Sequence, residues 1–160
     1  MKKLYIIPGW EETIEDKKYQ KVISMAREKG FEVTGKNVNW KQNLSEQIFL
    51  AEEESVIFGF SLGAVLARLI AQKYSCKHLI LASMTPLSSF SEDIKTRKAL
   101  CELVGDSFVD NVDRNLEKSH KAERQTVIYG DQENEEADVL VPNTDHEIND
   151  AYIKEIGRLI

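Results

Sequence analysis

The sequence has few of the residues that mark specialised protein classes. Its 160 residues include only two cysteines, three prolines and three histidines, and it contains no internal repeat or low-complexity tract. Two cysteines do not make a disulfide scaffold, and scattered histidines without zinc-type spacing predict neither a metal site nor a cofactor. Because no Pro/Gly-rich linker divides the chain, we expect one domain over residues 1–160.

Long apolar runs and clusters of basic residues are missing as well. The first apolar stretch, residues 4–8, is too short for a membrane span or a signal-peptide core. The sequence therefore predicts a cytoplasmic protein without a membrane span. Its net charge is −6, and no basic stripe is available to displace counterions from phosphates, so nucleic acid is not an expected partner. The pattern leaves the oligomeric state open.

Short apolar segments alternate with helical patterns along most of the chain. This alternation predicts a parallel sheet, since parallel neighbours need crossover connections, and strands that are apolar throughout indicate that helices cover both faces. The expected fold class is α/β, a three-layer α/β/α domain with a six-stranded parallel sheet in the order 2-1-3-4-5-6. The expected strands are 3–8, 31–38, 55–58, 78–82, 125–129 and 138–141, and helices are expected at 13–29, at 44–53, from 62 and from 147.

The segment 84–123 separates the fourth expected strand from the fifth and carries no strong strand pattern. Two sets of residues at helical spacing indicate two amphipathic helices. We expect one helix to pack on the sheet and the other to cover the site as a partial lid, without knowing which does which. The two sets are Ile94, Lys98, Cys101 and Phe108, Val112, Leu116.

A serine stands at the junction of the third strand and the next helix. Residues 59–63 have the sequence Gly-Phe-Ser-Leu-Gly, which places a glycine two positions before and two positions after Ser61. In so tight a turn, side chains at the glycine positions would collide with the neighbouring strand or helix. The pattern predicts a nucleophilic hydroxyl held out toward a substrate. The ordinary alternative is a serine that caps the helix.

A serine hydroxyl needs a base to take its proton, and the chain offers three histidines. His78 opens the fourth strand and His120 precedes the fifth, so both belong to the end of the sheet opposite the serine. His146 follows the sixth strand at the correct end, and we expect it to be the base. Thr144 and Glu147 have the spacing of a capping box, which predicts His146 in the first turn of the last helix.

The acid that orients the base is expected in the charged run after the fifth strand, residues 131–136. Glu133 and Asp131 are the two candidates. Position alone does not separate them, because charge-dense loops are often only solvated.

The motif around Ser61, the strand–helix alternation and the order serine, acid, histidine together resemble the α/β-hydrolase superfamily. The resemblance implies a minimal version of that fold that lacks the first two strands of the family. Family members commonly carry the acid three residues after a glycine that ends the strand. Applied to Gly130, this spacing favours Glu133 as the acid, with Asp131 as the alternative.

The resemblance also implies an oxyanion hole. Family members often have His-Gly after the first strand, where this chain has Pro8-Gly9-Trp10. The backbone N–H groups of Trp10 and Leu62 are then the expected donors. Trp10, Phe60 and Met84 are expected to line an apolar pocket for an acyl group.

Together these features predict a serine hydrolase that cleaves small carboxylic esters or thioesters through an acyl-enzyme on Ser61. The expected partner is a small-molecule substrate. The alternative is a catalytically inactive protein of the same fold with a binding or regulatory role, because fold does not guarantee activity. A flavodoxin-like nucleotide binder is disfavoured, since residues 9–12 offer bulk and negative charge where phosphate would bind.

Overall fold

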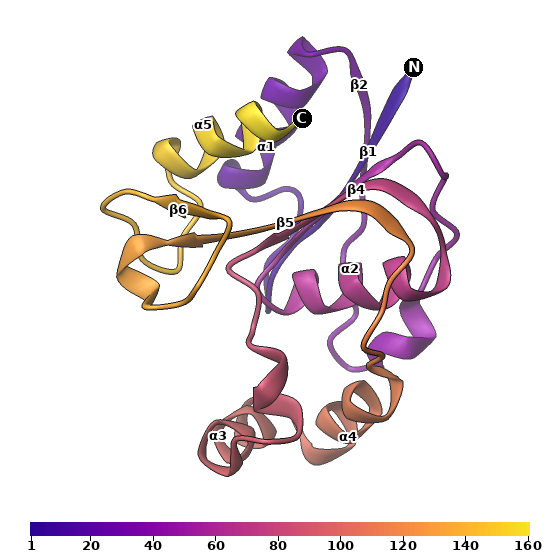
Figure 1. Ribbon diagram of the computed structural model, residues 1–160, viewed down its shortest axis with the longest axis vertical. Helices are drawn as coiled ribbons and strands as arrows, with labels where there is room; N and C mark the ends of the chain where they lie inside the picture. The colour runs from indigo at the N-terminus through magenta and orange to yellow at the C-terminus, as the bar shows by residue number, and fades with distance from the viewer.

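One sheet of six parallel strands runs through the computed structural model, which describes residues 1–160 (Figure 1). The strand order is β2-β1-β3-β4-β5-β6, so the predicted fold class and order are confirmed. Each expected strand is present, with ends that differ from the expectation by a few residues. The strands are β1 (Lys2–Ile7), β2 (Phe31–Gly35), β3 (Val56–Phe60), β4 (Cys76–Ala82), β5 (Ala122–Gly130) and β6 (Val139–Val141).

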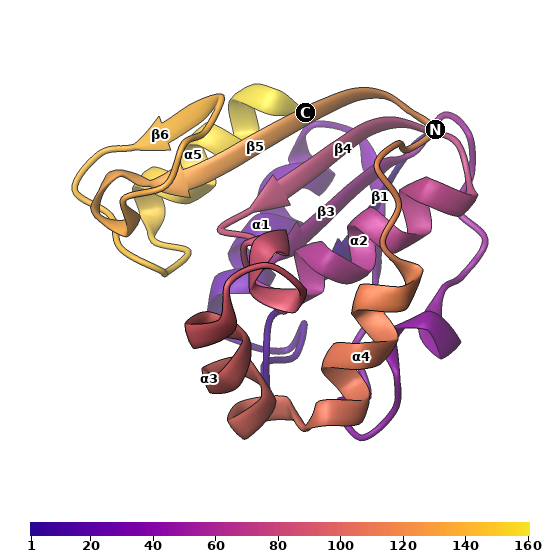
Figure 2. The same cartoon turned by 60° about the horizontal axis from the view of Figure 1, so that its bottom comes forward.

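Helices cover both faces of the sheet. In Figure 1, α1 and α5 lie side by side on one face and α2 lies on the other. Figure 2 shows α3 and α4 packed as a pair beyond α2. None of these helices combines the length and the hydropathy needed to span a bilayer. The helices are α1 (Lys17–Glu28), α2 (Leu62–Lys73), α3 (Ile94–Val104), α4 (Asp106–Asn115) and α5 (Asp150–Leu159).

The two-residue period of the strands divides the core between the two faces. In β1, Leu4 and Ile6 point into the cluster under α1 and α5, whereas Tyr5 and Ile7 point into the cluster on the opposite face. All four side chains are buried. A strand that is buried on both sides has to be apolar throughout, which explains the unbroken apolar runs in the sequence.

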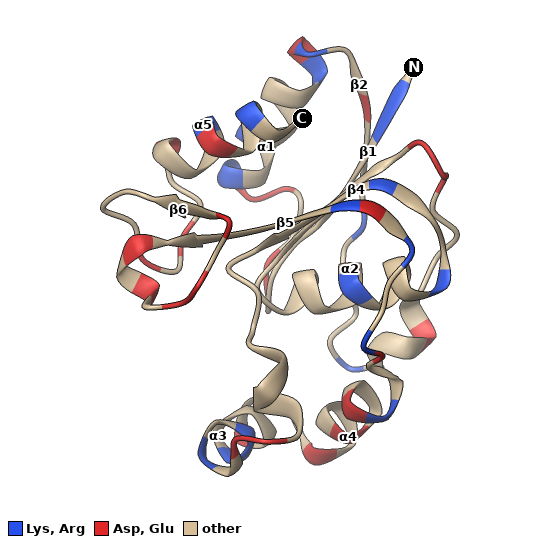
Figure 3. Ribbon diagram, in the orientation of Figure 1, with Lys and Arg blue, Asp and Glu red and all other residues tan.

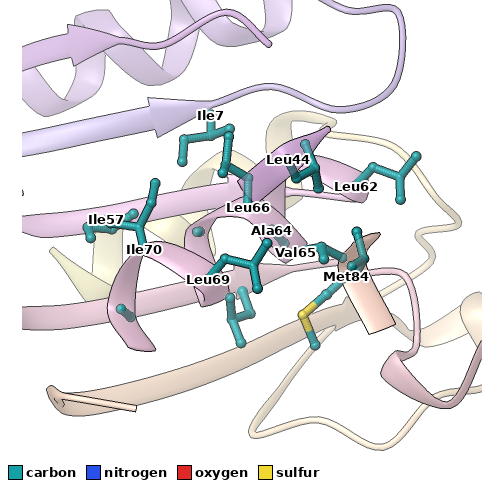
Figure 4. Packing of buried hydrophobic residues seen from close by; sticks show 14 of the residues in the cluster. Ile7, Leu44, Ile57, Leu62, Ala64, Val65, Leu66, Leu69, Ile70 and Met84 are labelled. Atoms are coloured by element: carbon teal, nitrogen blue, oxygen red, sulfur yellow. The ribbon is translucent and has the colours of Figure 1, made fainter. Parts of the chain in front are cut away.

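The helix α2 is the best-buried helix of the molecule. Its side chains Leu66, Leu69 and Ile70 pack in one cluster with Ile7 and Ile57 of the sheet (Figure 4). It carries only two charged residues (Figure 3). Since burying one such aliphatic side chain stabilises the fold by about 1.5–3 kcal/mol, these contacts fix α2 firmly against the sheet.

Two helix predictions need correction. The segment 44–53 forms only a short 3₁₀ turn, η1 (Leu44–Gln47), and the backbone at Ile48 is extended. This segment buries only Leu44 and Ala51 deeply, and so short a helix is marginal without a longer apolar face. In α3, Ile94 does not belong to the buried face. Its side chain is 84% exposed, and Leu100 is the buried residue of that helix.

Candidate active site

The sheet brings the turns after β1, β3 and β4 to one place. Ile7 is opposite Gly59, and Phe60 is opposite Ala82, so these three strands end at nearly the same level. The winding of the sheet reverses between β1 and β3, which is the point where open parallel sheets bind ligands.

The turn at Ser61 has the geometry that its two glycines predict. Ser61 adopts φ 57° and ψ −123°, a conformation that side chains rarely occupy. A Cβ at Gly59 would lie 2.6 Å from Ala64 Cα, and one at Gly63 would lie 2.1 Å from the carbonyl oxygen of Pro8. Only glycine fits at either position. The Ser61 side chain caps no N–H of α2, so its hydroxyl is available to another partner.

That partner is His146. The His146 Nε2 atom lies 3.0 Å from Ser61 Oγ, and the Nδ1 atom lies 2.7 Å from Glu133 Oε1. Because a carboxylate only accepts hydrogen bonds, Nδ1 carries the ring proton and Nε2 accepts the proton of the serine hydroxyl. The ring rests against Phe60, with the ring centroids 5.0 Å apart, and half of the His146 side chain is exposed.

His146 lies in a loop before α5 and not in its first turn. The residue that caps α5 is Asn149, whose side chain accepts the N–H of Tyr152, so the predicted capping box of Thr144 and Glu147 is wrong. Thr144 is fully buried, and its hydroxyl instead donates to a carbonyl two residues earlier and accepts from Asn149. Hydrogen bonds of the loop, not helix geometry, therefore hold His146 in place.

Asp131 supplies two of those bonds. Its carboxylate accepts the backbone N–H groups of Asn143 at 3.0 Å and Thr144 at 3.1 Å. The backbone N–H of Gln132 donates to the carbonyl of Thr144 at 2.9 Å. Asp131 thus orders the loop that carries His146 but does not contact the imidazole.

Glu133 is the acid that reaches His146. Its side chain is only 7% exposed, and its second oxygen, Oε2, accepts two further hydrogen bonds. The donors are the backbone N–H of Gly130 at 2.7 Å and the hydroxyl of Ser83 at 2.6 Å. A buried carboxylate needs such partners, and here both of its oxygens have them.

The other two histidines lie far from Ser61 in the sheet. His78 is buried in β4, with Nε2 2.8 Å from Thr126 Oγ1, and burial lowers the pKa of His78 to about 4. His120 accepts the N–H of Ala122 just before β5, and partial burial lowers its pKa. Both side chains belong to the amino end of the sheet.

The N–H groups of Trp10 and Leu62 have no hydrogen-bond acceptor within the chain. Leu62 is the first residue of α2, where an N–H has no intrahelical acceptor. The loop after β1, which carries Trp10, is held by side chains: the N–H of Gly9 donates to the Tyr19 hydroxyl at 2.9 Å and to the Glu12 carboxylate at 3.2 Å. The role of Trp10 and Leu62 as oxyanion donors stays a prediction.

A cavity of about 460 Å³ opens beside the Ser61 and His146 side chains. Trp10 and Phe60 line it, as expected for pocket residues. Met84 is not among the lining residues; it is buried in the core cluster near α2 (Figure 4). No group of three or more His, Cys, Asp or Glu side chains is arranged to hold a metal ion.

Sequence analysis missed one wall of this cavity and one neighbour of Glu133. The wall is a face of α3 with the helical spacing i, i+3, i+4, i+7, a signal present in the sequence but without a strong apolar stripe. The neighbour is Ser83, which directly follows β4 as Ser61 follows β3. The residues on the α3 wall are Thr96, Ala99, Leu100 and Leu103.

No family model matches the sequence, and a search of curated proteins finds no match. Solved structures do resemble it. Alpha/beta hydrolase domain-containing protein 10 from mouse has a TM-score of 0.69 at 13% identity, with 98% of this chain and 87% of that chain covered. Est1E from Butyrivibrio proteoclasticus has a TM-score of 0.65 at 13% identity, with 98% and 84% covered.

A third similar structure is esterase B from Lactobacillus rhamnosis, inhibited by a tributyrin phosphonate. Its TM-score is 0.58 at 17% identity, with 82% of this chain and 55% of that chain covered. At such identities the likeness concerns the fold alone. The strand order, the turn at Ser61 and these structural neighbours show that the chain has the α/β-hydrolase fold, in a minimal form with six parallel strands.

Proposed function

We propose that the protein is a serine hydrolase that cleaves small carboxylic esters or thioesters through an acyl-enzyme on Ser61. The observation that carries this proposal is the continuous hydrogen-bond chain from Ser61 through His146 to Glu133. The three residues come from three separate loops, and each makes the contact that its role requires. The esterases among the structural neighbours support the same reaction class.

In the first half of the reaction, His146 Nε2 takes the proton of the hydroxyl as Ser61 Oγ attacks the carbonyl carbon. Glu133 holds the imidazole in the Nδ1–H tautomer and stabilises the positive charge that develops on it. The carbonyl oxygen becomes an oxyanion, which the free N–H groups of Trp10 and Leu62 would bind. Each donor of this kind is worth about 3 kcal/mol in the transition state.

In the second half, His146 returns the proton to the departing alcohol or thiol, which leaves Ser61 acylated. A water molecule then attacks the acyl group while His146 takes one of its protons. As this second intermediate breaks down, His146 gives the proton to Ser61 Oγ, which restores the serine hydroxyl and releases the carboxylic acid. The exposed half of the His146 side chain gives water access to the base.

The cavity wall indicates the kind of acyl group. Leu100 and Leu103 of α3 face the cavity together with Trp10 and Phe60 from the sheet side. The lining also includes the carboxylate of Glu12 and several hydroxyl groups, so an uncharged acyl group fits it, with its apolar part buried against the hydrophobic side chains. We propose that α3 is the part of segment 84–123 that acts as a partial lid.

The decisive experiment is labelling with a fluorophosphonate probe, combined with hydrolysis of p-nitrophenyl butyrate and a butyryl thioester. The purified protein should be labelled on Ser61 and should hydrolyse both substrates. Ser61→Ala should abolish labelling and lower turnover to the background rate. Ser24→Ala removes an exposed hydroxyl from α1 and should change neither result.

Two outcomes would contradict the proposal. Labelling that persists in Ser61→Ala would mean that another residue is the nucleophile. A folded protein with neither labelling nor turnover would favour the inactive binding or regulatory protein of the same fold.

A further inference from the structure

Ser83 is the first residue after β4 and lies beneath the site. It is 1% exposed, and its backbone N–H donates to the carbonyl of Ile128 at 2.7 Å. Its φ is 43°, in the left-handed region that costs an ordinary residue about 1 kcal/mol or more. Such a conformation persists only where the surroundings hold it in place.

The hydrogen bonds around Ser83 define where its single proton goes. Glu133 Oε2 lies 2.6 Å from Ser83 Oγ, and the Tyr152 hydroxyl lies 2.9 Å from the same oxygen. Since a carboxylate only accepts, the serine donates to Glu133. Burial raises the pKa of Tyr152, which therefore stays a neutral phenol, and its single proton is shared between Ser83 Oγ and the carbonyl oxygen of Ile128 at 3.0 Å.

We propose that Ser83 is a positioning residue for the acid, an inference that rests on the proposed function. Its hydroxyl and the N–H of Gly130 hold Oε2 from two sides, and this leaves Oε1 facing His146 Nδ1. Ser83 acts only through Glu133, because its hydroxyl contacts neither Ser61 nor His146.

A glutamate at this place needs such a support. Its side chain has one more rotatable bond than that of an aspartate, so more rotamers compete with the one that reaches the imidazole. Two donors on one oxygen restrict the carboxylate to a single orientation. Their charge-assisted bonds are also stronger than bonds between neutral groups.

The strained backbone separates this role from a purely structural one. With φ at 43°, glycine would relieve the strain at residue 83 without loss of any core side chain. If Ser83 mattered only for the shape of the turn, Ser83→Gly would have a kcat equal to or higher than that of the wild type. If the hydroxyl holds Glu133, Ser83→Gly and Ser83→Ala should lower kcat by the same factor, although the two variants differ in backbone strain.

The test measures kcat and KM for p-nitrophenyl butyrate in Ser83→Ala and Ser83→Gly. Both should lower kcat about 10-fold, the usual effect of losing a supporting contact to a site residue, with KM within about twofold. The matched control is Ser55→Ala, which removes another fully buried hydroxyl that bonds only to the carbonyl of Glu52. The control should keep the wild-type kcat.

Proton NMR tests the same inference without any substrate. The proton on His146 Nδ1 lies in a short hydrogen bond to Glu133 and should give a downfield resonance that disappears in Glu133→Gln. Ser83→Ala and Ser83→Gly should shift or broaden this resonance, and Ser55→Ala should not.

Folded Ser83 variants with an unchanged resonance and an unchanged kcat would overturn the inference. A wild type that takes no fluorophosphonate label and hydrolyses neither the ester nor the thioester would instead refute the proposed function, and the resonance would then still decide whether Ser83 orients Glu133.

Discussion

The two ends of the parallel sheet differ in how their turns are built. Every non-glycine residue with a positive φ lies within four residues after the C-terminal end of a strand. Directly before a strand, the only residue with a positive φ is Gly30, which precedes β2. The non-glycine residues are Glu11 after β1, Ser61 after β3, Ser83 after β4, Asn134 after β5 and Asn143 after β6.

Strained backbone conformations are therefore concentrated at the carboxyl end of the sheet. Asparagine adopts the left-handed region at little cost in free energy, but serine does not, so the backbone at Ser61 and Ser83 is strained. Their conformations are held by the packed strands on either side, and both serines contact the proposed catalytic groups. At the amino end the chain only has to enter the next strand, and glycine makes that turn without strain.

The histidines sharpen the same contrast. His146, at the carboxyl end, is half exposed and bonded through both ring nitrogens to Ser61 and Glu133. His78, at the amino end, is 5% exposed and bonded to Thr126. The first histidine is accessible and aligned with a hydroxyl and a carboxylate, whereas the second is enclosed in the protein interior.

The largest expected effect comes from replacing each of these histidines by asparagine. His146→Asn should lower kcat/KM about 10⁴-fold because the base is lost, and should change the free energy of unfolding by less than about 0.5 kcal/mol. His78→Asn should keep the activity of each folded molecule but lower stability by about 1–3 kcal/mol. The rate of ester hydrolysis measures the activity, and urea unfolding measures the stability. Equal losses of activity in both variants would break the contrast.

The two acids after β5 give the next effect. Glu133→Gln should lower kcat about 10³-fold, because an amide neither stabilises the imidazolium nor reliably selects the Nδ1–H tautomer. Asp131→Asn should lower kcat less than about 10-fold, because the amide oxygen still accepts a hydrogen bond from one of the two loop N–H groups. Steady-state kinetics of both isosteric variants decides the assignment. A larger loss in Asp131→Asn would reverse the roles given to these residues.

A glycine-to-alanine substitution at each end of the sheet tests the difference between the turns at the two ends. Gly63→Ala should lower the free energy of unfolding by more than about 3 kcal/mol, because the new Cβ would lie 2.1 Å from a backbone oxygen of Pro8. Gly30→Ala should lower the free energy of unfolding by only about 1 kcal/mol, since a φ of 84° strains alanine but the space around residue 30 is open. Urea unfolding of both variants gives the comparison, and similar costs would argue against the tight turn at Ser61.

The smallest expected effect is a pH dependence that originates at His78. Burial lowers its pKa from 6.5 to about 4, so between these values the unfolded chain binds a proton that the folded protein does not. The stability from the neutral, buried ring is present above pH 6.5 and is lost as the pH falls toward 4. Between pH 7 and pH 5 we expect a loss of about 1–2 kcal/mol.

The control for this effect is His78→Asn, measured by urea unfolding at both pH values. Other groups titrate equally in the two proteins, so only the difference between their pH slopes reports on His78. Identical slopes would mean that the ring at the amino end is not held neutral by burial.

Sequence patterns predicted the strands of the sheet and the position of Ser61 because both leave local signals, and the strand order was expected with the minimal α/β-hydrolase fold. Unbroken apolar runs such as residues 79–81 identify strands that are buried on both faces. The glycines around Ser61 identify the tight turn, since a Cβ at Gly59 would collide with the first turn of α2 and one at Gly63 with the end of β1. The placement of His146 at the correct end followed from strand direction alone.

The remaining features depended on contacts between distant residues. The choice between Glu133 and Asp131 depends on a 3₁₀ turn, η3 (Asp131–Glu133), which returns the Glu133 carboxylate to the N–H of Gly130. The start of α5 was misplaced because Asn149, not Thr144, is its cap. Local spacing allowed both alternatives in each case.

By itself, therefore, the sequence determined a six-stranded parallel α/β sheet with a serine at the end of β3 and a histidine after β6. The tertiary structure decided which carboxylate meets His146, that Ser83 donates a hydrogen bond to this carboxylate, and that α3 walls the cavity. The physical reason is range. Apolar runs and the spacing of the glycines around Ser61 can be recognised within a short segment of the chain, whereas a hydrogen bond between Ser83 and Glu133, 50 residues apart, exists only after the sheet has brought their strand ends together.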